Sequence, residues 1–157
     1  MPFIRVYLHF VWSTKNRTPY LSTPEIRNQV WEHIYLNAKL KEIKTLIVGG
    51  HNDHCHCLVS FSKEQTISKV AQLLKGECSF WINKSGLILE HFPNNKFDWQ
   101  DEYYVESVSP EGLYHVRDYI LNQEQHHKHF TFDQEYEKLM TEFNEQNLFL
   151  DRIGPKS

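Results

Sequence analysis

The chain has 157 residues, of which 40% are hydrophobic and 14% aromatic. This composition favours one folded domain and excludes a disordered chain. The formal charge of −3 gives no sign of a nucleic-acid binder, although a basic patch on one side is compatible with it. Three cysteines, no signal-peptide core and no apolar run of the ~18 residues that a membrane span needs indicate a cytoplasmic protein without disulfides or a membrane partner.

The first half of the chain predicts a strand, a helix and a hairpin. Residues 5–13 are rich in β-branched and aromatic side chains and predict a strand, which a polar, basic loop follows. Pro24 suits the first turn of a helix, and the apolar stripe after it predicts a helix to about Lys41. Strands are expected over residues 45–48 and 55–61, and their short connection indicates a hairpin.

The second half adds two helices and a strand. An amphipathic pattern predicts a helix over residues 66–81, and an irregular segment leads to a strand over residues 103–108. Ser109-Pro110-Glu111 predicts the start of a third long helix, one that carries Tyr119 and Gln123. A polar helix follows Phe130, so a single domain is expected over residues 1–157, with a helical or irregular tail after about residue 133.

The order of these elements predicts the fold class. The succession β-α-β-β-α-β is that of the ferredoxin-like split βαβ arrangement, an α+β fold with a central antiparallel sheet. Here an added C-terminal helix bearing a tyrosine follows the last strand. Because one fold serves many functions, function has to be inferred from the site residues.

A stretch of histidines and cysteines in the predicted hairpin is the most informative pattern. Along a strand His54 and His56 share one face and can bind one ion, while Cys55 and Cys57 lie on the other face. Two ligands are too few for a structural zinc site, and the alternation keeps the cysteines away from the histidines. The open positions indicate a catalytic metal that also binds a phosphate. Alternatively, the histidines are ordinary polar residues of a sheet, with Asp53 as a turn residue before it.

A tyrosine and a glutamine lie one helical turn apart on the last predicted helix. Tyr119 and Gln123 are at positions i and i+4, so they share a helix face. We interpret the tyrosine as a nucleophile and the amide oxygen as a third metal ligand, and imidazole with oxygen ligands suits Mg²⁺ or Mn²⁺. Without further context, Tyr119 would be a core aromatic residue and Gln123 an exposed helical one.

Several cations and aromatic residues are candidates for DNA binding. Lys15 and Arg17 in the first loop and Lys75 on the second helix are expected to contact phosphates, and Trp12 to stack on an unpaired base. The alternative for the two loop residues is a plain solvated loop. The histidines at 126, 127 and 129 are interpreted as a solvated or DNA-facing cluster, not as catalytic residues.

Two of these motifs resemble a known family. Asp53-His54-Cys55-His56-Cys57-Leu58-Val59-Ser60 resembles the histidine–hydrophobic–histidine signature of HUH nucleases, with Cys55 in place of a bulkier aliphatic residue. Val116-Arg117-Asp118-Tyr119-Ile120-Leu121-Asn122-Gln123 resembles the tyrosine helix of the single-tyrosine transposases, which are insertion sequence 200-like. The closest resemblance is to the branch associated with repetitive extragenic palindromes (REP). It covers residues 5–133 approximately, and the tail over residues 147–152 lacks the typical ending.

The resemblance implies an activity and its residues. An enzyme of this family would bind single-stranded or hairpin DNA, with His54, His56 and Gln123 holding one Mg²⁺ or Mn²⁺ ion. Tyr119 would attack the scissile phosphate, leaving a 5′-phosphotyrosine link and a free 3′ hydroxyl. The family often forms homodimers, sometimes with the tyrosine helix acting across subunits.

Two other functions remain open at this stage. One is a non-catalytic nucleic-acid-binding module on the same fold, which would need neither the tyrosine nor the metal. The other is a metal-dependent phosphodiesterase that uses water as its nucleophile.

Overall fold

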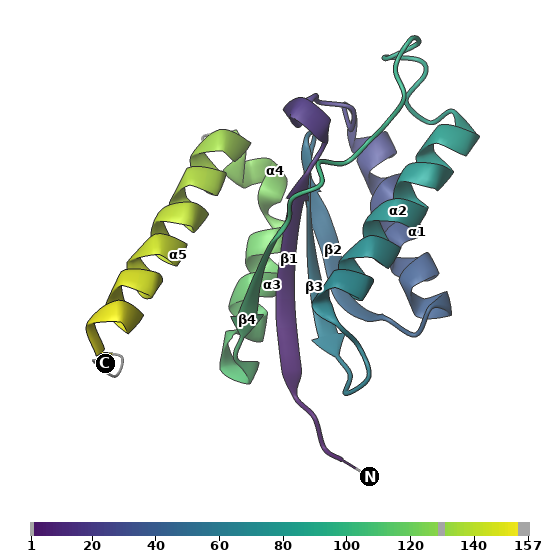
Figure 1. Cartoon of the computed structure of the whole chain (residues 1–157). Coiled ribbons are helices and arrows are strands. Elements are labelled where there is room, and N and C mark those ends of the chain that lie inside the picture. Colours follow the sequence, from purple (N-terminus) through teal and green to yellow (C-terminus); the bar gives the residue numbers. More distant parts are fainter. Residues whose placement is uncertain (1, 129–130, 154–157) are drawn as a thin grey trace. The chain divides into compact units, whose positions relative to one another are not determined.

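Four strands form one antiparallel sheet in the order β2-β3-β1-β4. The computed structural model describes residues 2–128 and 131–153, with side chains as far as residue 145. The strands are β1 (Val6–Ser13), β2 (Lys44–His51), β3 (His54–Phe61) and β4 (Tyr104–Val108), as Figure 1 shows. Each βαβ unit is split by a strand of the other, since β3 lies between β1 and β2, and β1 between β3 and β4. The predicted α+β, ferredoxin-like fold is therefore confirmed.

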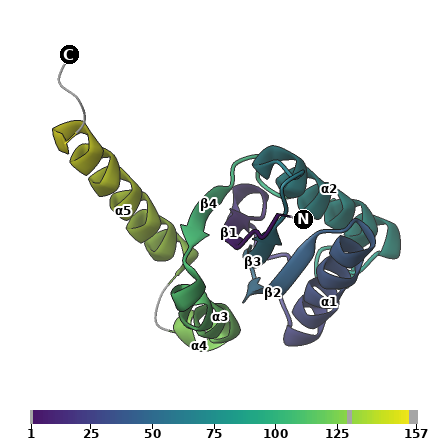
Figure 2. The same ribbon diagram turned by 90° about the horizontal axis from the view of Figure 1, so that it is seen from below.

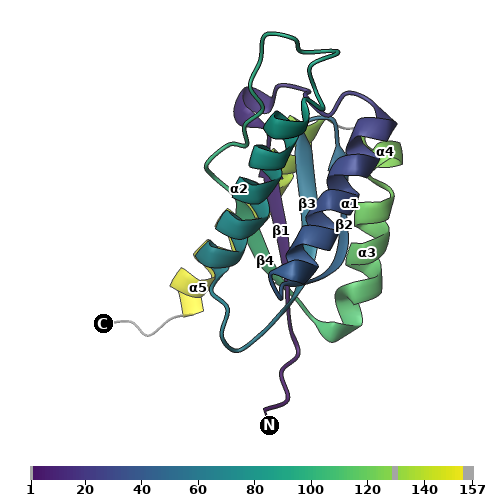
Figure 3. The same ribbon diagram turned by 90° about the vertical axis from the view of Figure 1, so that its right-hand side faces the viewer.

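Two helices cover one face of this sheet, α1 (Pro24–Leu40) and α2 (Ile67–Ser85), as Figures 2 and 3 show. Both begin at a threonine whose side-chain oxygen accepts a hydrogen bond from a backbone N–H of the first turn, Thr23 in α1 and Thr66 in α2. The second helix continues past its predicted end at residue 81 and stops at Gly86, whose φ of 70° is left-handed.

The main core lies between the sheet and these two helices. Leu8, Phe10 and Trp12 of β1 point into it, together with Cys55 and Cys57 of β3. Burial raises the pKa of both thiols, so they stay protonated and serve as small apolar side chains. The irregular segment before β4 also contributes buried side chains, including Ile88, Phe97 and Trp99. Its hydrophobic contribution was not predicted.

The helix that carries Tyr119 packs on β2 and β3. Figure 2 shows α3 (Leu113–Leu121) across the sheet from α1 and α2. The prediction of one long helix here is wrong. A 3-10 turn, η2 (Pro110–Gly112), precedes α3, and Asn122 leaves the helical conformation with ψ near 17° before a short α4 (Gln123–His126). This break decides the direction in which Gln123 points.

Gly49 of β2 allows α3 to come close to the sheet. A Cβ atom at this position would lie 2.8 Å from Ile120 Cγ2 and 3.0 Å from the Ile120 carbonyl oxygen. Any side chain there would therefore push against the backbone of α3. Ile120 is 1% exposed, which shows how tightly the helix packs at this point.

The chain divides into two compact units, residues 1–124 and 125–157. The second contains α5 (Phe132–Ile153), which begins with a capping box. In it the Thr131 hydroxyl accepts from the Gln134 N–H at 3.2 Å, and the Gln134 side chain accepts from the Thr131 N–H at 2.9 Å. His129 lies outside the described residues, as do the side chains of residues 147–152. Within the described ranges, no helix is long and apolar enough to span a membrane.

We predict that Gly49→Ala destabilises the protein by about 1–3 kcal/mol, because the methyl group would be forced against the backbone of α3. Gly76→Ala is the matched control, since a Cβ at that exposed position in α2 meets nothing within 4 Å. It should be neutral or stabilise by up to ~1 kcal/mol. Urea unfolding of both variants measures the difference, and equal stabilities would contradict the close approach of α3.

Candidate metal and nucleophile site

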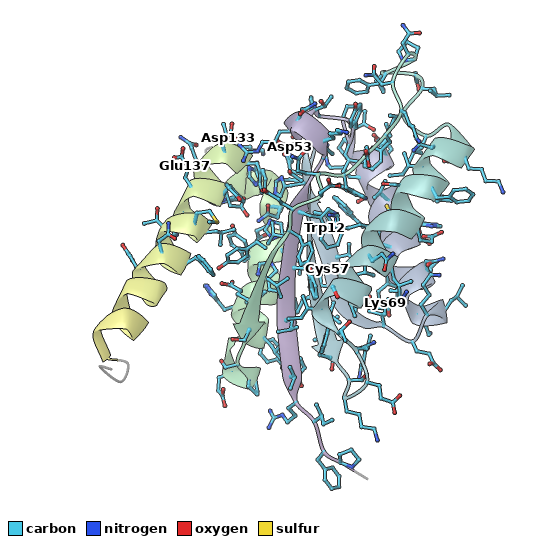
Figure 4. The ribbon with its side chains drawn as sticks, in the orientation of Figure 1. Trp12, Asp53, Cys57, Lys69, Asp133 and Glu137 are labelled. Atoms are coloured by element: carbon cyan, nitrogen blue, oxygen red, sulfur yellow. The ribbon has the colours of Figure 1, made fainter. Side chains whose placement is uncertain are left out.

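The two histidines of the hairpin lie on the face of the sheet opposite the main core. His54 and His56 pair with Ser13 and Val11 of β1, and both are fully buried. Their ring centroids are 5.1 Å apart. Figure 4 labels Cys57 and Trp12 on the side covered by α1 and α2, in agreement with the predicted separation of histidine and cysteine faces.

His54 is held between a carboxylate and an amide. Its Nδ1 lies 2.8 Å from the Asp53 Oδ1, and since a carboxylate only accepts, the ring donates there. Its Nε2 lies 2.9 Å from the Gln123 Oε1. The orientation of that amide follows from its other contact, since Gln123 Nε2 donates to the Tyr119 carbonyl oxygen at 3.3 Å.

This arrangement fits a divalent cation. With its proton on Nδ1, a neutral His54 presents a lone pair from Nε2 toward an amide oxygen, which is another acceptor. Two acceptors 2.9 Å apart repel each other unless a proton or a metal ion lies near both. Neighbouring ligands of an octahedral ion at ~2.1 Å are themselves about 3 Å apart. An amide oxygen suits hard divalent ions and an imidazole nitrogen suits transition-metal ions, so this mixed donor set fits a divalent cation.

Tyr119 of α3 lies beside the same histidines. Its ring meets the His56 ring edge to face, with centroids 5.5 Å apart at 84°. The side chain is half-buried, so part of it reaches the surface of the protein. A nucleophile candidate from a helix and two ligand candidates from a strand therefore converge within one chain, with Gln123 beside them.

An ion pair between a buried arginine and an exposed glutamate holds the start of α4 in place. Arg27 of α1, whose side chain is 7% exposed, donates to Glu124 Oε1 from Nε at 3.0 Å and from Nη2 at 2.7 Å. Its Nη1 donates to the Leu21 carbonyl oxygen at 2.8 Å. Because Glu124 directly follows Gln123, this pair anchors the backbone that carries the third ligand candidate.

The predicted basic loop lies beside the turn before His54. Lys15 and Arg17 belong to a 3-10 turn, η1 (Lys15–Arg17), which follows β1 after Thr14. The Thr14 N–H donates to the Asp53 carbonyl oxygen at 2.8 Å, which ties this loop to the turn that orients His54. Lys15 is exposed and Arg17 half-buried, so both can meet a ligand arriving at this end of the sheet, where Figure 4 labels Asp53.

Two other candidates for DNA binding do not join the site. Trp12 is 1% exposed in the main core and packs edge to face on Trp99, so no base can stack on it in this structure. Lys75 Nζ donates to the carbonyl oxygens of Gln100 and Asp101 at 2.6 and 3.0 Å. Partial burial lowers the pKa of Lys75 against the opposing effect of nearby aspartates. It lines a cavity of about 370 Å³ on the α2 side of the sheet.

Sequence reasoning missed three residues around the site. Asp53 was expected as a turn residue, which it is, but it also orients His54. Its position directly before the histidine was the only available signal. Arg27 gave none, since an arginine in an amphipathic helix is commonplace. His9 of β1, whose ring stacks on His56 with centroids 5.0 Å apart, depends on a strand register that the sequence does not state.

The second unit holds another group of polar side chains. His127 Nε2 lies 2.8 Å from Glu135 Oε2, and His126 Nε2 lies 3.6 Å from the same oxygen. Ligand atoms of these three residues come within 4.8 Å of one another. Ion pairing of the histidines with Glu135 accounts for their arrangement.

Comparison with known proteins gives a consistent family. Residues 3–123 match the family described as "Transposase IS200 like". A solved structure of a candidate transposase from Deinococcus radiodurans R1 shares the fold, with a TM-score of 0.62 and 20% identity over 78% of this chain and 93% of that one. A REP-associated tyrosine transposase bound to a REP hairpin has a TM-score of 0.53 and 15% identity, over 81% of this chain and 72% of that one. No curated protein matches.

We predict that Glu124→Ala costs about 2–4 kcal/mol, because it leaves the buried Arg27 guanidinium without its counter-charge. The value lies at the lower end for buried pairs since the Glu124 side chain is 53% exposed. Glu102→Ala, which removes an exposed carboxylate, is the control and should stay within about 0.5 kcal/mol of wild type. Urea unfolding decides, and similar stabilities of the two variants would show that the pair does not anchor α4.

Proposed function

The chain belongs to the family of IS200-like transposases, and we propose that it cleaves and rejoins single-stranded DNA through a covalent link to Tyr119. The observation that carries the proposal is the convergence of His54, His56 and Tyr119, with Gln123 Oε1 at 2.9 Å from His54. A site of this kind needs ligands with open positions and a hydroxyl within reach of the phosphate that the metal binds.

In the proposed reaction the Tyr119 oxygen attacks the scissile phosphorus. A phosphorus–oxygen bond to Tyr119 forms as the bond to the 3′ oxygen breaks, which leaves a 5′-phosphotyrosine and a free 3′ hydroxyl. The phenolic proton passes to solvent, and the departing 3′ oxygen takes up a proton. Because the bond energy is kept in the phosphotyrosine, a 3′ hydroxyl can later reverse the step and join strands.

His54, His56 and Gln123 are the proposed ligands of one divalent ion, Mg²⁺ or Mn²⁺. When bound, such an ion polarises a phosphate oxygen and lowers the barrier to attack on phosphorus. Asp53 holds His54 with Nε2 directed toward Gln123, and the Arg27–Glu124 pair holds the backbone beside Gln123. The site residues are thereby oriented before DNA arrives.

The proposed substrate is single-stranded DNA next to a hairpin. A structural relative with the same fold is described as bound to a REP hairpin, and we extend this class of ligand to the chain. Lys15 and Arg17 are the proposed phosphate contacts, because their loop is tied to the turn beside His54. Trp12 is left out of the proposed contacts because it is buried, and Lys75 because backbone carbonyls hold its ammonium group. That the protein acts as a homodimer in the cytoplasm stays a prediction.

Tyr119→Phe should abolish a covalent adduct with labelled single-stranded hairpin DNA in Mn²⁺, because the variant lacks only the attacking oxygen. Tyr114→Phe is the matched control, since Tyr114 lies on the same helix and is 71% exposed. It should form as much adduct as wild type. Denaturing electrophoresis of the labelled DNA separates free strands from protein-linked ones.

The same gel, together with a DNA-binding measurement under native conditions, distinguishes the alternative functions. Cleavage that persists in Tyr119→Phe without an adduct would indicate a phosphodiesterase that uses water. Binding with no cleavage in either protein would indicate a passive nucleic-acid-binding module. Either result contradicts the proposed reaction.

A double variant Lys15→Ala/Arg17→Ala should weaken DNA binding and flatten its salt dependence. Loss of two phosphate contacts should reduce the slope of log K against log salt by about 1.4 for a single strand. Lys39→Ala/Lys41→Ala is the charge-matched control, because both residues are exposed at the far end of α1. Fluorescence anisotropy over a salt series gives both slopes, and equal slopes for the two double variants would remove this loop from the DNA path.

A further inference from the structure

Three polar side chains from three adjacent strands form a series of polar contacts that ends at His56. His9 Nε2 of β1 lies 2.8 Å from His56 Nδ1 of β3, and both residues are almost fully buried. On the other side of the ring, His9 Nδ1 lies 3.5 Å from Glu106 Oε1 of β4, an ion-pair distance. The Tyr104 hydroxyl donates to the second carboxylate oxygen of Glu106 at 2.9 Å.

The Glu106 carboxylate at one end determines which nitrogen atoms of His9 and His56 carry protons. The His9 imidazole, and after it the Tyr104 hydroxyl, holds the pKa of Glu106 below its usual value against the effect of partial burial. Glu106 is therefore an ionised acceptor, so the His9 proton belongs on Nδ1. In a neutral His9, Nε2 then accepts, and His56 donates from Nδ1. A neutral His56 with its proton on Nδ1 has its lone pair on Nε2.

His54 also carries its proton on Nδ1 and its lone pair on Nε2, here because of a direct contact with a carboxylate. There the Asp53 carboxylate accepts directly from Nδ1, and Nε2 faces Gln123 Oε1. Each histidine of β3 is thus linked through Nδ1 to a carboxylate, one directly and the other through a second imidazole. Carboxylates behind metal-binding histidines fix the tautomer and ring orientation and strengthen the ligand.

We propose that His9 and Glu106 are positioning residues that hold His56 with Nε2 toward the divalent metal of the site. This inference rests on the proposed function of His54 and His56 as metal ligands. A purely structural role at this position would not require a buried imidazole paired with a carboxylate. Other residues on the same face, Val11, Leu58 and Ile120, are apolar and buried. Imidazoles placed among them lose solvation, which only specific hydrogen bonds compensate.

The test measures metal affinity, tautomer and stability on the full-length protein. His9→Leu should weaken Mn²⁺ binding by about 10–100-fold in calorimetric titration. His9→Gln should bind nearly as well as wild type, since its amide oxygen can accept from His56 Nδ1. Long-range ¹H–¹⁵N spectra in EDTA should show His56 protonated on Nδ1 in wild type and in His9→Gln, and a mixture of tautomers in His9→Leu.

His33→Leu is the control for the loss of a partly buried histidine that pairs with a carboxylate away from the site. His33 also pairs with a carboxylate, Glu77, at 2.8 Å, and its ring stacks on Trp81, but it lies on α1. The His33→Leu variant should have a lower melting temperature in EDTA than wild type and an unchanged Mn²⁺ affinity. If His9→Leu does not fold, Glu106→Ala replaces it, because Glu106 is partly exposed, and the expected result is a weaker Mn²⁺ affinity with mixed His56 tautomers.

The outcomes separate this inference from the proposed function. If wild type and His54→Ala bind Mn²⁺ equally, the proposed metal site fails, and the inference falls with it. If His54→Ala loses Mn²⁺ while His9→Leu and Glu106→Ala retain full affinity and the Nδ1 tautomer of His56, the inference alone is overturned.

Discussion

The two-residue alternation of side chains along β3 is the constraint on which the structure depends. It sends Cys55 and Cys57 into the main core and His54 and His56 to the opposite face, where α3 packs. A shift of one residue in the pairing of β3 with β1 would exchange the two sets and place both imidazoles in the main core, away from Asp53, His9 and Gln123. The fold and the candidate site therefore depend on the same register.

The position of α3 on the sheet decides whether the histidines meet Tyr119. A short connection joins β4 to this helix, and Gly49 lets its backbone come against β2 at Ile120. The break at Asn122 then turns Gln123 toward His54, and Arg27 holds the residue that follows it. Close packing of α3, the end of the helix at Asn122 and one ion pair together bring Tyr119 and Gln123 next to the histidines of β3.

The distribution of charge explains how an acidic protein can be compatible with the proposed DNA reaction. Two of its carboxylates, Asp53 and Glu106, face the imidazoles of His54 and His9. Lys15 and Arg17 supply positive charge in the loop beside Asp53. Net charge describes the sum of these groups, whereas binding of an anion depends on where each lies.

Local pattern in the sequence determined much of this protein: the order of strands and helices, the fold class, and the face that His54 and His56 share. Periodicity and turn residues act over a few neighbours, so the sequence reveals them directly. Only the tertiary structure decided that Trp12 is buried and that the tyrosine helix ends at Leu121. It also decided that Arg27 pairs with Glu124 and that His9 lies between His56 and Glu106. These features depend on strand register and on contacts between residues far apart in the chain, which no local pattern encodes.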